Sequence, residues 1–127
     1  MKKKDLPTSP HLQIYKPQIT SMLSIAHRIS GFCLNIVIIF FSFWIISLAL
    51  GESAYNYLIN VLFSIPTKIV VLLSILGFCY HFLNGLRHIM WDFGFLLDLK
   101  VSTISGYLIL VFSIILTIFL ILKIGVF

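Results

Sequence analysis

Residues 67–92 read TKIVVLLSILGFCYHFLNGLRHIMWD, and this stretch decides the fold. Residues 69–80 are apolar except for Ser74. A helix that rises ~1.5 Å per residue has crossed most of a hydrocarbon core ~30 Å thick by the time it reaches His81. A titratable side chain at that depth is costly unless it faces protein, a cavity or a metal ion. The stretch therefore predicts a membrane-spanning helix with a candidate site at His81.

Two further runs, residues 29–50 and 104–122, contain no charged side chain and are also about as long as a membrane span. The chain of 127 residues is 60% hydrophobic and 10% charged, whereas soluble domains are usually about 25% charged. Helices are the expected form, because inside lipid each backbone group must be bonded within its own segment. We therefore expect an all-α membrane protein with one domain, 1–127, in which an arm over 1–23 precedes three transmembrane helices over about 24–50, 66–91 and 104–124.

The sequence also predicts local structure around the spans. Prolines argue against a continuous helix in the arm, so the first helix is expected to begin near Met22, capped by Thr20 or Ser21. Residues 54–64 are expected to form a loop or a short interfacial helix. Pro66 fits the first turn of the second span. The third span carries only small or weakly polar features, and we assign it to packing and anchoring.

The charge distribution predicts the topology. Seven of the nine Lys and Arg residues lie in the arm, at the start of the first span or between the second and third spans, namely Lys2, Lys3, Lys4, Lys16, Arg28, Arg87 and Lys100. The positive-inside rule then places the N-terminal arm in the cytoplasm and the C-terminus outside. The basic balance also indicates contact with anionic membrane lipid, and no basic patch with interleaved aromatic residues indicates nucleic-acid binding.

The start of the chain bears on the choice of membrane. It is short and rich in Lys, and the first apolar run begins well downstream, which indicates neither a signal peptide nor a mitochondrial transit peptide. With the Ile, Phe and Lys bias of the composition, this favours a bacterial inner membrane. A mitochondrial inner membrane, with the subunit encoded in the organelle, is the alternative.

One face of the second span carries the candidate chemistry. His81, Asn84, Gly85 and His88 are spaced three or four residues apart and share that face. One interpretation is a packing face in which small and polar residues join two helices. The other is a haem site, since a histidine inside a membrane is suited to ligate haem iron and Gly85 would leave room for the flat ring.

The number of axial ligands bears on the haem interpretation. His81 and His88 stack ~10.5 Å apart along one helix and cannot stand on opposite sides of one haem. His27 is expected at about the level of His88, roughly two turns from His81. If the iron has two axial ligands, the second is therefore expected from another subunit.

Polar residues also gather at the cytoplasmic ends of the first two spans. Ser24, His27 and Arg28 lie on the first span, and Arg87 and His88 on the second. Two roles would suit these residues. One is to anchor the helix ends among the lipid headgroups. The other is to form a cationic pocket that binds two haem propionates or a quinone carbonyl. Ser24 lies one turn before Arg28, so a hydroxyl and a guanidinium would reach one ligand oxygen.

Three motifs carry a resemblance to a known family. They are Ser9-Pro10-His11-Leu12-Gln13-Ile14-Tyr15, then Ser24-Ile25-Ala26-His27-Arg28-Ile29-Ser30-Gly31, and then His81-x-x-Asn84-Gly85-Leu86-Arg87-His88-x-x-Trp91-Asp92. In this order the chain resembles the cytochrome b membrane-anchor subunits of succinate dehydrogenase, respiratory complex II. The resemblance extends from the arm to the third span.

The resemblance implies a role in electron transfer from succinate to ubiquinone. It implies a haem b shared with a second small hydrophobic anchor subunit, and docking of an iron–sulfur subunit and a flavoprotein subunit. By the same resemblance His81 is the axial ligand, His27 and Arg28 lie near the haem propionates, and Ser24 and Arg28 line the quinone site. The chain would not itself oxidise succinate, because it has neither a flavin-binding glycine motif nor a cysteine ligand set.

Three other functions remain open from the sequence. The same architecture would serve a quinol:fumarate reductase working in the opposite direction. A structural anchor without haem or quinone would recruit a soluble enzyme. A small transporter subunit would need a continuous polar path, and the first and third spans offer only scattered polar side chains.

Overall fold

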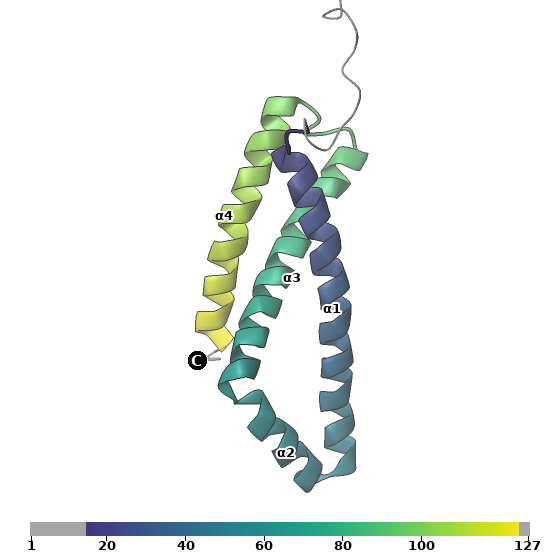
Figure 1. The fold of residues 1–127 in the computed structure, drawn as a ribbon, viewed down its shortest axis with the longest axis vertical. Coiled ribbons are helices and arrows are strands. Elements are labelled where there is room, and N and C mark those ends of the chain that lie inside the picture. Colours follow the sequence, from purple (N-terminus) through teal and green to yellow (C-terminus); the bar gives the residue numbers. More distant parts are fainter. Residues whose placement is uncertain (1–14, 125–127) are drawn as a thin grey trace, which may run out of the picture.

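The computed structural model describes residues 15–124, and every regular element in that range is an α-helix. The four helices are α1 (Ile19–Leu50), α2 (Glu52–Leu62), α3 (Ile65–Asp92) and α4 (Leu99–Ile124). In Figure 1, α1, α3 and α4 run along the long axis, and the short α2 lies obliquely between the lower ends of α1 and α3. The three long helices are each long and apolar enough to cross a membrane, which confirms the three predicted spans.

The helix starts differ from those expected. The amide of Met22 donates to the carbonyl of Gln18 at 3.1 Å, so the first turn of α1 already includes Thr20 and Ser21. Gln18 is the N-cap residue, and it makes no side-chain capping bond. The third span was expected from about residue 104, but α4 starts at Leu99.

An aspartate explains the early start of α4. The Asp98 side-chain oxygen accepts from the amide of Lys100 at 2.9 Å and from that of Val101 at 3.2 Å. A carboxylate that bonds the first free amides of a helix also interacts favourably with the helix dipole. Asp98 therefore precedes the helix, and residues 99–103 belong to α4 and not to the loop.

Residues 52–62 form the short helix that was one of the two expectations for this segment. Gly51 has a φ of 98°, which favours glycine, and ends α1. Half-buried side chains of α2 recur at helical spacing, namely Ala54, Tyr55, Leu58, Ile59 and Leu62. Its other face is exposed and carries Glu52, Asn56 and Asn60. The helix is therefore amphipathic, as an element at a membrane surface should be.

Small residues pack α4 against its neighbours, which agrees with the packing role expected for the third span. The buried positions of α4 are Ser102, Gly106, Ser113 and Thr117, all on one face. A Cβ added to Gly106 would lie 2.7 Å from Cδ1 of Leu23 in α1. In lipid, small residues stabilise helix pairs because they let the backbones approach closely.

α1 and α3 are close at one end of the bundle and part towards α2, as Figure 1 shows. An apolar hollow of about 1110 Å³ lies on the side where they part, lined by residues such as Val37, Phe43, Leu58 and Val70. The close end, where α1 begins and α3 ends, is called the site end below.

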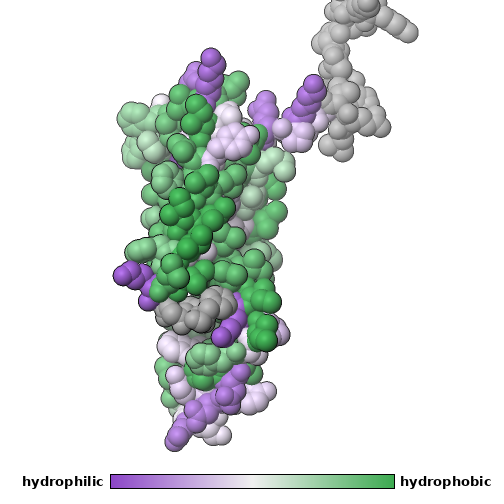
Figure 2. Space-filling model, turned by 90° about the vertical axis from the view of Figure 1, so that its left-hand side faces the viewer, coloured by the Kyte–Doolittle hydropathy of each residue, from purple (hydrophilic) through white to green (hydrophobic). Residues whose placement is uncertain are grey.

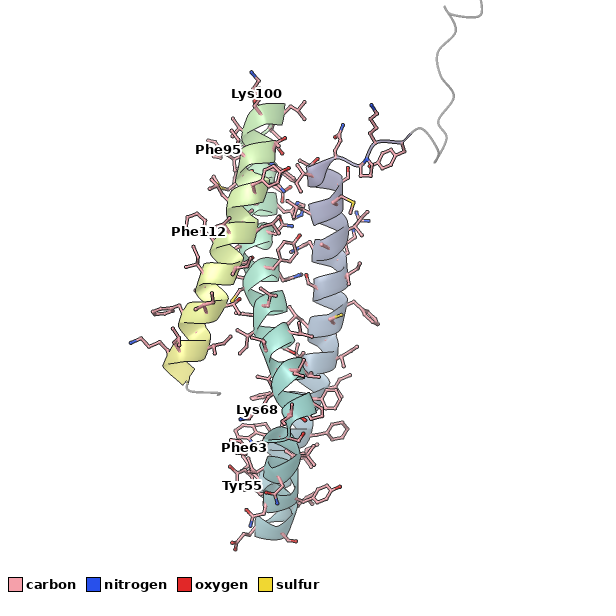
Figure 3. The ribbon with its side chains drawn as sticks, turned by 60° about the vertical axis from the view of Figure 1, so that its left-hand side comes forward. Tyr55, Phe63, Lys68, Phe95, Lys100 and Phe112 are labelled. Carbon is pink, nitrogen blue, oxygen red and sulfur yellow. The ribbon has the colours of Figure 1, made fainter. Side chains whose placement is uncertain are left out.

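Most of the surface is apolar. Figure 2 shows hydrophobic side chains over the middle of one face and hydrophilic residues gathered mainly towards its ends. Phe112, midway along α4, points away from the other helices and is 55% exposed. Lys100 lies at the site end and Tyr55 at the opposite end (Figure 3). Such a surface is suited to lipid or to another membrane chain.

Candidate functional site

Three histidines come together where α1 and α3 meet at the site end. The His27 and His81 rings are stacked, with centroids 3.9 Å apart and planes within 8°. The His27 and His88 rings are 5.1 Å apart and tilted. The expectation that His27 lies two turns from His81 is therefore wrong. The two helices are antiparallel, and their actual register places His27 between His81 and His88.

The His81 ring is half-buried and held by α1. Its Nδ1 lies 3.1 Å from the Ser30 hydroxyl oxygen and 3.1 Å from the backbone carbonyl oxygen of His27. The Ser30 hydroxyl itself donates to the same carbonyl at 2.8 Å. One side of the ring is thus fixed to the α1 backbone.

The carbonyl of Leu23 joins the two helices one turn closer to the site end. It accepts from the Tyr80 hydroxyl at 2.6 Å and from the Asn84 side-chain amide at 3.4 Å. Asn84 is fully buried, and its amide also lies 3.5 Å from Nε2 of His88. The face expected to carry His81, Asn84 and His88 is therefore the face turned towards α1.

Two glycines line the histidine cluster, and they differ in how tightly they fit. A Cβ added to Gly31 would lie 2.8 Å from Cε1 of His81, closer than real Cβ contacts. A Cβ added to Gly85 would lie 3.6 Å from Cε1 of His27, which is ordinary contact. The close approach is therefore at Gly31 in α1, whereas the sequence drew attention to Gly85 in α3.

Ser24 and Arg28 line a shallow polar hollow of about 430 Å³ at the site end. The remaining lining residues are Thr20, Ser21, Ile25 and Trp91. Ser24 is half-buried and Arg28 is exposed. The structure thus brings the predicted serine and arginine to one hollow, next to the histidine cluster along α1.

Arg87 does not join a cationic pocket with Arg28. Its guanidinium is 2% exposed and turns towards α4, where it donates to the Ser102 carbonyl at 2.6 Å and to the Ser105 hydroxyl at 3.1 Å. It also lies over the Trp91 ring, 4.2 Å from the centroid. Arg87 therefore binds α4, whereas His88, the next residue in sequence, contacts His27 of α1, although both side chains also contact Asn84 and Trp91.

Comparison with known proteins gives the chain a family. The model of the succinate dehydrogenase/fumarate reductase transmembrane subunit matches residues 2–120. The chain belongs to this family. It is 43% identical over 114 residues to the succinate dehydrogenase cytochrome b556 subunit of Rickettsia prowazekii (strain Madrid E), covering 90% of this chain and 89% of the relative. It is 44% identical over 110 residues to the succinate dehydrogenase cytochrome b560 subunit of Marchantia polymorpha, covering 82% and 80%.

The site fits the haem b that the names of these succinate dehydrogenase relatives imply. Among residues 15–124, no three His, Cys, Asp or Glu side chains converge as a dedicated metal site would require. Haem iron takes at most two ligands from protein, so a haem does not need three converging side chains. Nδ1 of His27 is buried with no hydrogen-bond partner within the described range, so the cluster has a polar atom that a ligand would satisfy.

Three residues of this site carried no role in the sequence analysis. They are Ser30, Gly31 and Trp91, although all three belong to the motifs on which the resemblance rests. Ser30 and Gly31 follow His27 by three and four residues, so helical periodicity placed them on its face. Trp91 follows Arg87 by four residues and contacts His88 edge-on at 4.9 Å. The four-residue spacing from Arg87 would therefore have predicted Trp91 as a residue of this site.

Proposed function

We propose that this chain is the membrane-anchoring haem b subunit of a succinate:quinone oxidoreductase. It shares haem b with a second small hydrophobic anchor subunit, helps to form the ubiquinone site, and docks an iron–sulfur subunit and a flavoprotein subunit. The observation that carries the proposal is the pairing of His27 and His81 between two candidate membrane spans, α1 and α3, in a chain whose named relatives are cytochrome b subunits.

His81 would ligate the haem iron from this chain. When bound, haem b supplies a one-electron redox centre inside the membrane. His27 does not supply the opposite ligand, because its ring lies 3.9 Å from that of His81 and leaves no room for a macrocycle between them. A second iron ligand would therefore come from the second anchor subunit.

His27, Arg28 and His88 hold the polar edge of the cofactor. Haem propionates are anionic and need donors or positive charge when they leave water. The unpartnered Nδ1 of His27 and the exposed guanidinium of Arg28 meet that need. Arg87 has no part in it, since its donors are used by α3 and α4.

Ser24 and Arg28 bind the quinone head in the 430 Å³ hollow. A hydroxyl and a guanidinium on one helix face both donate hydrogen bonds to a carbonyl oxygen. Reduction builds negative charge on that oxygen, and fixed donors stabilise it as they stabilise an oxyanion. This chain therefore contributes position and electrostatics, and the soluble subunits oxidise succinate.

The site end faces the cytoplasm, or the matrix if the subunit is mitochondrial, and the chain resides in a bacterial or mitochondrial inner membrane. Support comes from the positive-inside rule, because Lys16, Arg28 and Lys100 belong to that side. A periplasmic reporter enzyme fused after residue 127 should be active in a bacterial host. The same reporter inserted between α3 and α4 should be inactive, and the reverse pattern would overturn the orientation.

The haem assignment is tested by reduced-minus-oxidised absorbance spectra of the assembled complex. Wild type should show a b-type signal, His81→Ala should lose it or change it markedly, and His27→Ala should retain it because His27 is no ligand. An unchanged spectrum in His81→Ala would reject His81 as the ligand. A wild-type complex without a b-type signal would support the haem-free structural anchor instead.

The quinone assignment is tested by comparing two electron acceptors. Arg28→Ala should slow ubiquinone reduction at least tenfold, while succinate oxidation with an artificial acceptor that reacts with the soluble subunits stays normal. Lys100→Ala removes a cation from the same end but outside the hollow, and should behave as wild type. Normal ubiquinone turnover in Arg28→Ala would remove the role of Arg28.

A quinol:fumarate reductase would use the same residues in the reverse direction. The matching family description covers both enzymes, and the named relatives are succinate dehydrogenase subunits, which favours succinate oxidation.

A further inference from the structure

The hydrogen bonds around His81 determine which ring nitrogen carries its proton. The Ser30 hydroxyl donates its only hydrogen to the His27 carbonyl oxygen at 2.8 Å. Towards Nδ1 of His81, 3.1 Å away, the Ser30 oxygen therefore presents lone pairs and acts as an acceptor.

The second neighbour of Nδ1 is also an acceptor. The carbonyl oxygen of His27, 3.1 Å away, has no hydrogen to donate. An unprotonated Nδ1 would face two oxygens with no hydrogen between them. Nδ1 of His81 therefore carries the hydrogen, and in the neutral ring the free lone pair is on Nε2, where a metal ion would bind.

Packing holds the ring in the orientation that the hydrogen bonds select. Gly31 touches the edge of the ring, where an added Cβ would lie 2.8 Å from Cε1 and 3.7 Å from Nε2. His27 covers one face at a centroid distance of 3.9 Å. The ring is thus constrained at Nδ1, at one edge and on one face, all by residues 27–31 of α1.

We propose that Ser30 is a positioning residue that, together with the carbonyl of His27, makes Nε2 of His81 the ligating nitrogen, and that its acceptor oxygen lowers the reduction potential of the haem. The inference rests on the proposed function, in which His81 is a haem ligand. When the ring nitrogen that does not bind the metal donates its N–H in a hydrogen bond, the imidazole becomes a more basic ligand. A more basic ligand stabilises oxidised over reduced iron, so loss of the Ser30 acceptor should raise the potential.

The test is a redox titration of the haem absorbance in the intact complex. Ser30→Ala should keep the haem and shift its midpoint potential upwards. Ser30→Thr keeps the hydroxyl, which in a helix bonds the same upstream carbonyl, and should restore a value close to wild type.

Ser47→Ala is the matched control. The Ser47 hydroxyl is buried and donates to the carbonyl of Trp44, three residues earlier, at 2.7 Å, as Ser30 does to His27, but no histidine accompanies it. Its removal should leave the potential unchanged. If Ser30→Ala fails to assemble, Ser30→Cys replaces the hydroxyl with a weakly accepting sulfur and should produce a smaller upward shift.

Two results separate this inference from the proposed function. A haem-replete Ser30→Ala complex with an unchanged or lowered potential would overturn the role of Ser30 and leave His81 as the ligand. An unchanged spectrum in His81→Ala would overturn the ligand assignment itself.

Discussion

At the residue scale, the backbone carbonyl of Leu23 accepts much of the hydrogen bonding that joins α1 to α3. It accepts side-chain hydrogen bonds from Tyr80 and Asn84, both buried in the interface. Ser24 and His27 follow it within one turn of α1. The bonds to Leu23 therefore hold this turn of α1, with Ser24 and His27, in place against α3.

Tyr80→Phe should destabilise the subunit by about 1 kcal/mol, because it removes one buried hydrogen bond and leaves the ring in place. Thermal unfolding of the detergent-solubilised complex measures this. Tyr57→Phe, at a side chain that is 75% exposed, should leave the unfolding temperature unchanged. Equal effects of the two substitutions would show that the Leu23 bond contributes nothing.

Gly31→Ala should lower the haem content of the complex, because the added methyl group collides with the His81 ring. Gly77→Ala, in the same membrane region, has no atom within 4 Å of the added methyl group and should retain full haem. The pyridine haemochrome assay gives the ratio of haem to protein. Full haem in Gly31→Ala would mean that the ring can move away without loss of binding.

At the element scale, α3 and α4 are joined by a buried arginine and a row of small residues. Arg87 donates to Ser102 and Ser105 of α4 and to Asn84 of its own helix. Every one of these acceptors is a neutral oxygen. The guanidinium thus joins α3 to α4 by hydrogen bonds, next to the histidine cluster. It is buried, so it is not exposed to a haem propionate or a quinone carbonyl.

Arg87→Lys should destabilise the complex by about 1.5–3 kcal/mol, because an ammonium group cannot span the several acceptors that a planar guanidinium reaches. Arg28→Lys is the control, since Arg28 is exposed and should tolerate the change in a stability assay. Chemical denaturation monitored by tryptophan fluorescence compares the two. An Arg87→Lys complex as stable as wild type would show that charge alone suffices here.

The helices could be predicted from the sequence, whereas their relative rotations could not. Long apolar runs determine the number and type of the spans, and helical periodicity correctly grouped His81, Asn84 and His88 on one face. The contact between His27 and His81, and the turn of Arg87 towards α4, depend on how the helices pack. The start of α4 was missed because the Asp98 cap was assigned to the loop.

At the scale of the whole molecule, the chain is a thin bundle with little interior. Large apolar side chains remain exposed along all three long helices, for example Phe32, Phe40, Phe78 and Phe112. The histidine cluster is only half-buried. The proposed site is therefore open to lipid or to another chain.

The chain purified alone and supplied with haem should not give the spectrum of a low-spin haem with two histidine ligands. Among residues 15–124, His27 lies too close to His81 and His88 for a haem to fit between the rings, and His81 and His88 lie along one helix, so these three cannot reach both sides of one iron. Near-infrared magnetic circular dichroism identifies such ligation, with the complete complex as the positive control. A bis-histidine signal from the isolated chain would remove the need for a ligand from a partner subunit.

The buried guanidinium of Arg87 also constrains the biogenesis of the protein. A buried arginine in a span is costly, by about 2.5–3.5 kcal/mol at the centre and by less towards an end, where Arg87 lies. The oxygens of Ser102 and Ser105 that offset this cost are synthesised after α3. Until α4 has been synthesised, the Arg87 guanidinium therefore lacks these acceptors. We expect α3 and α4 to enter the lipid together, as a helical hairpin.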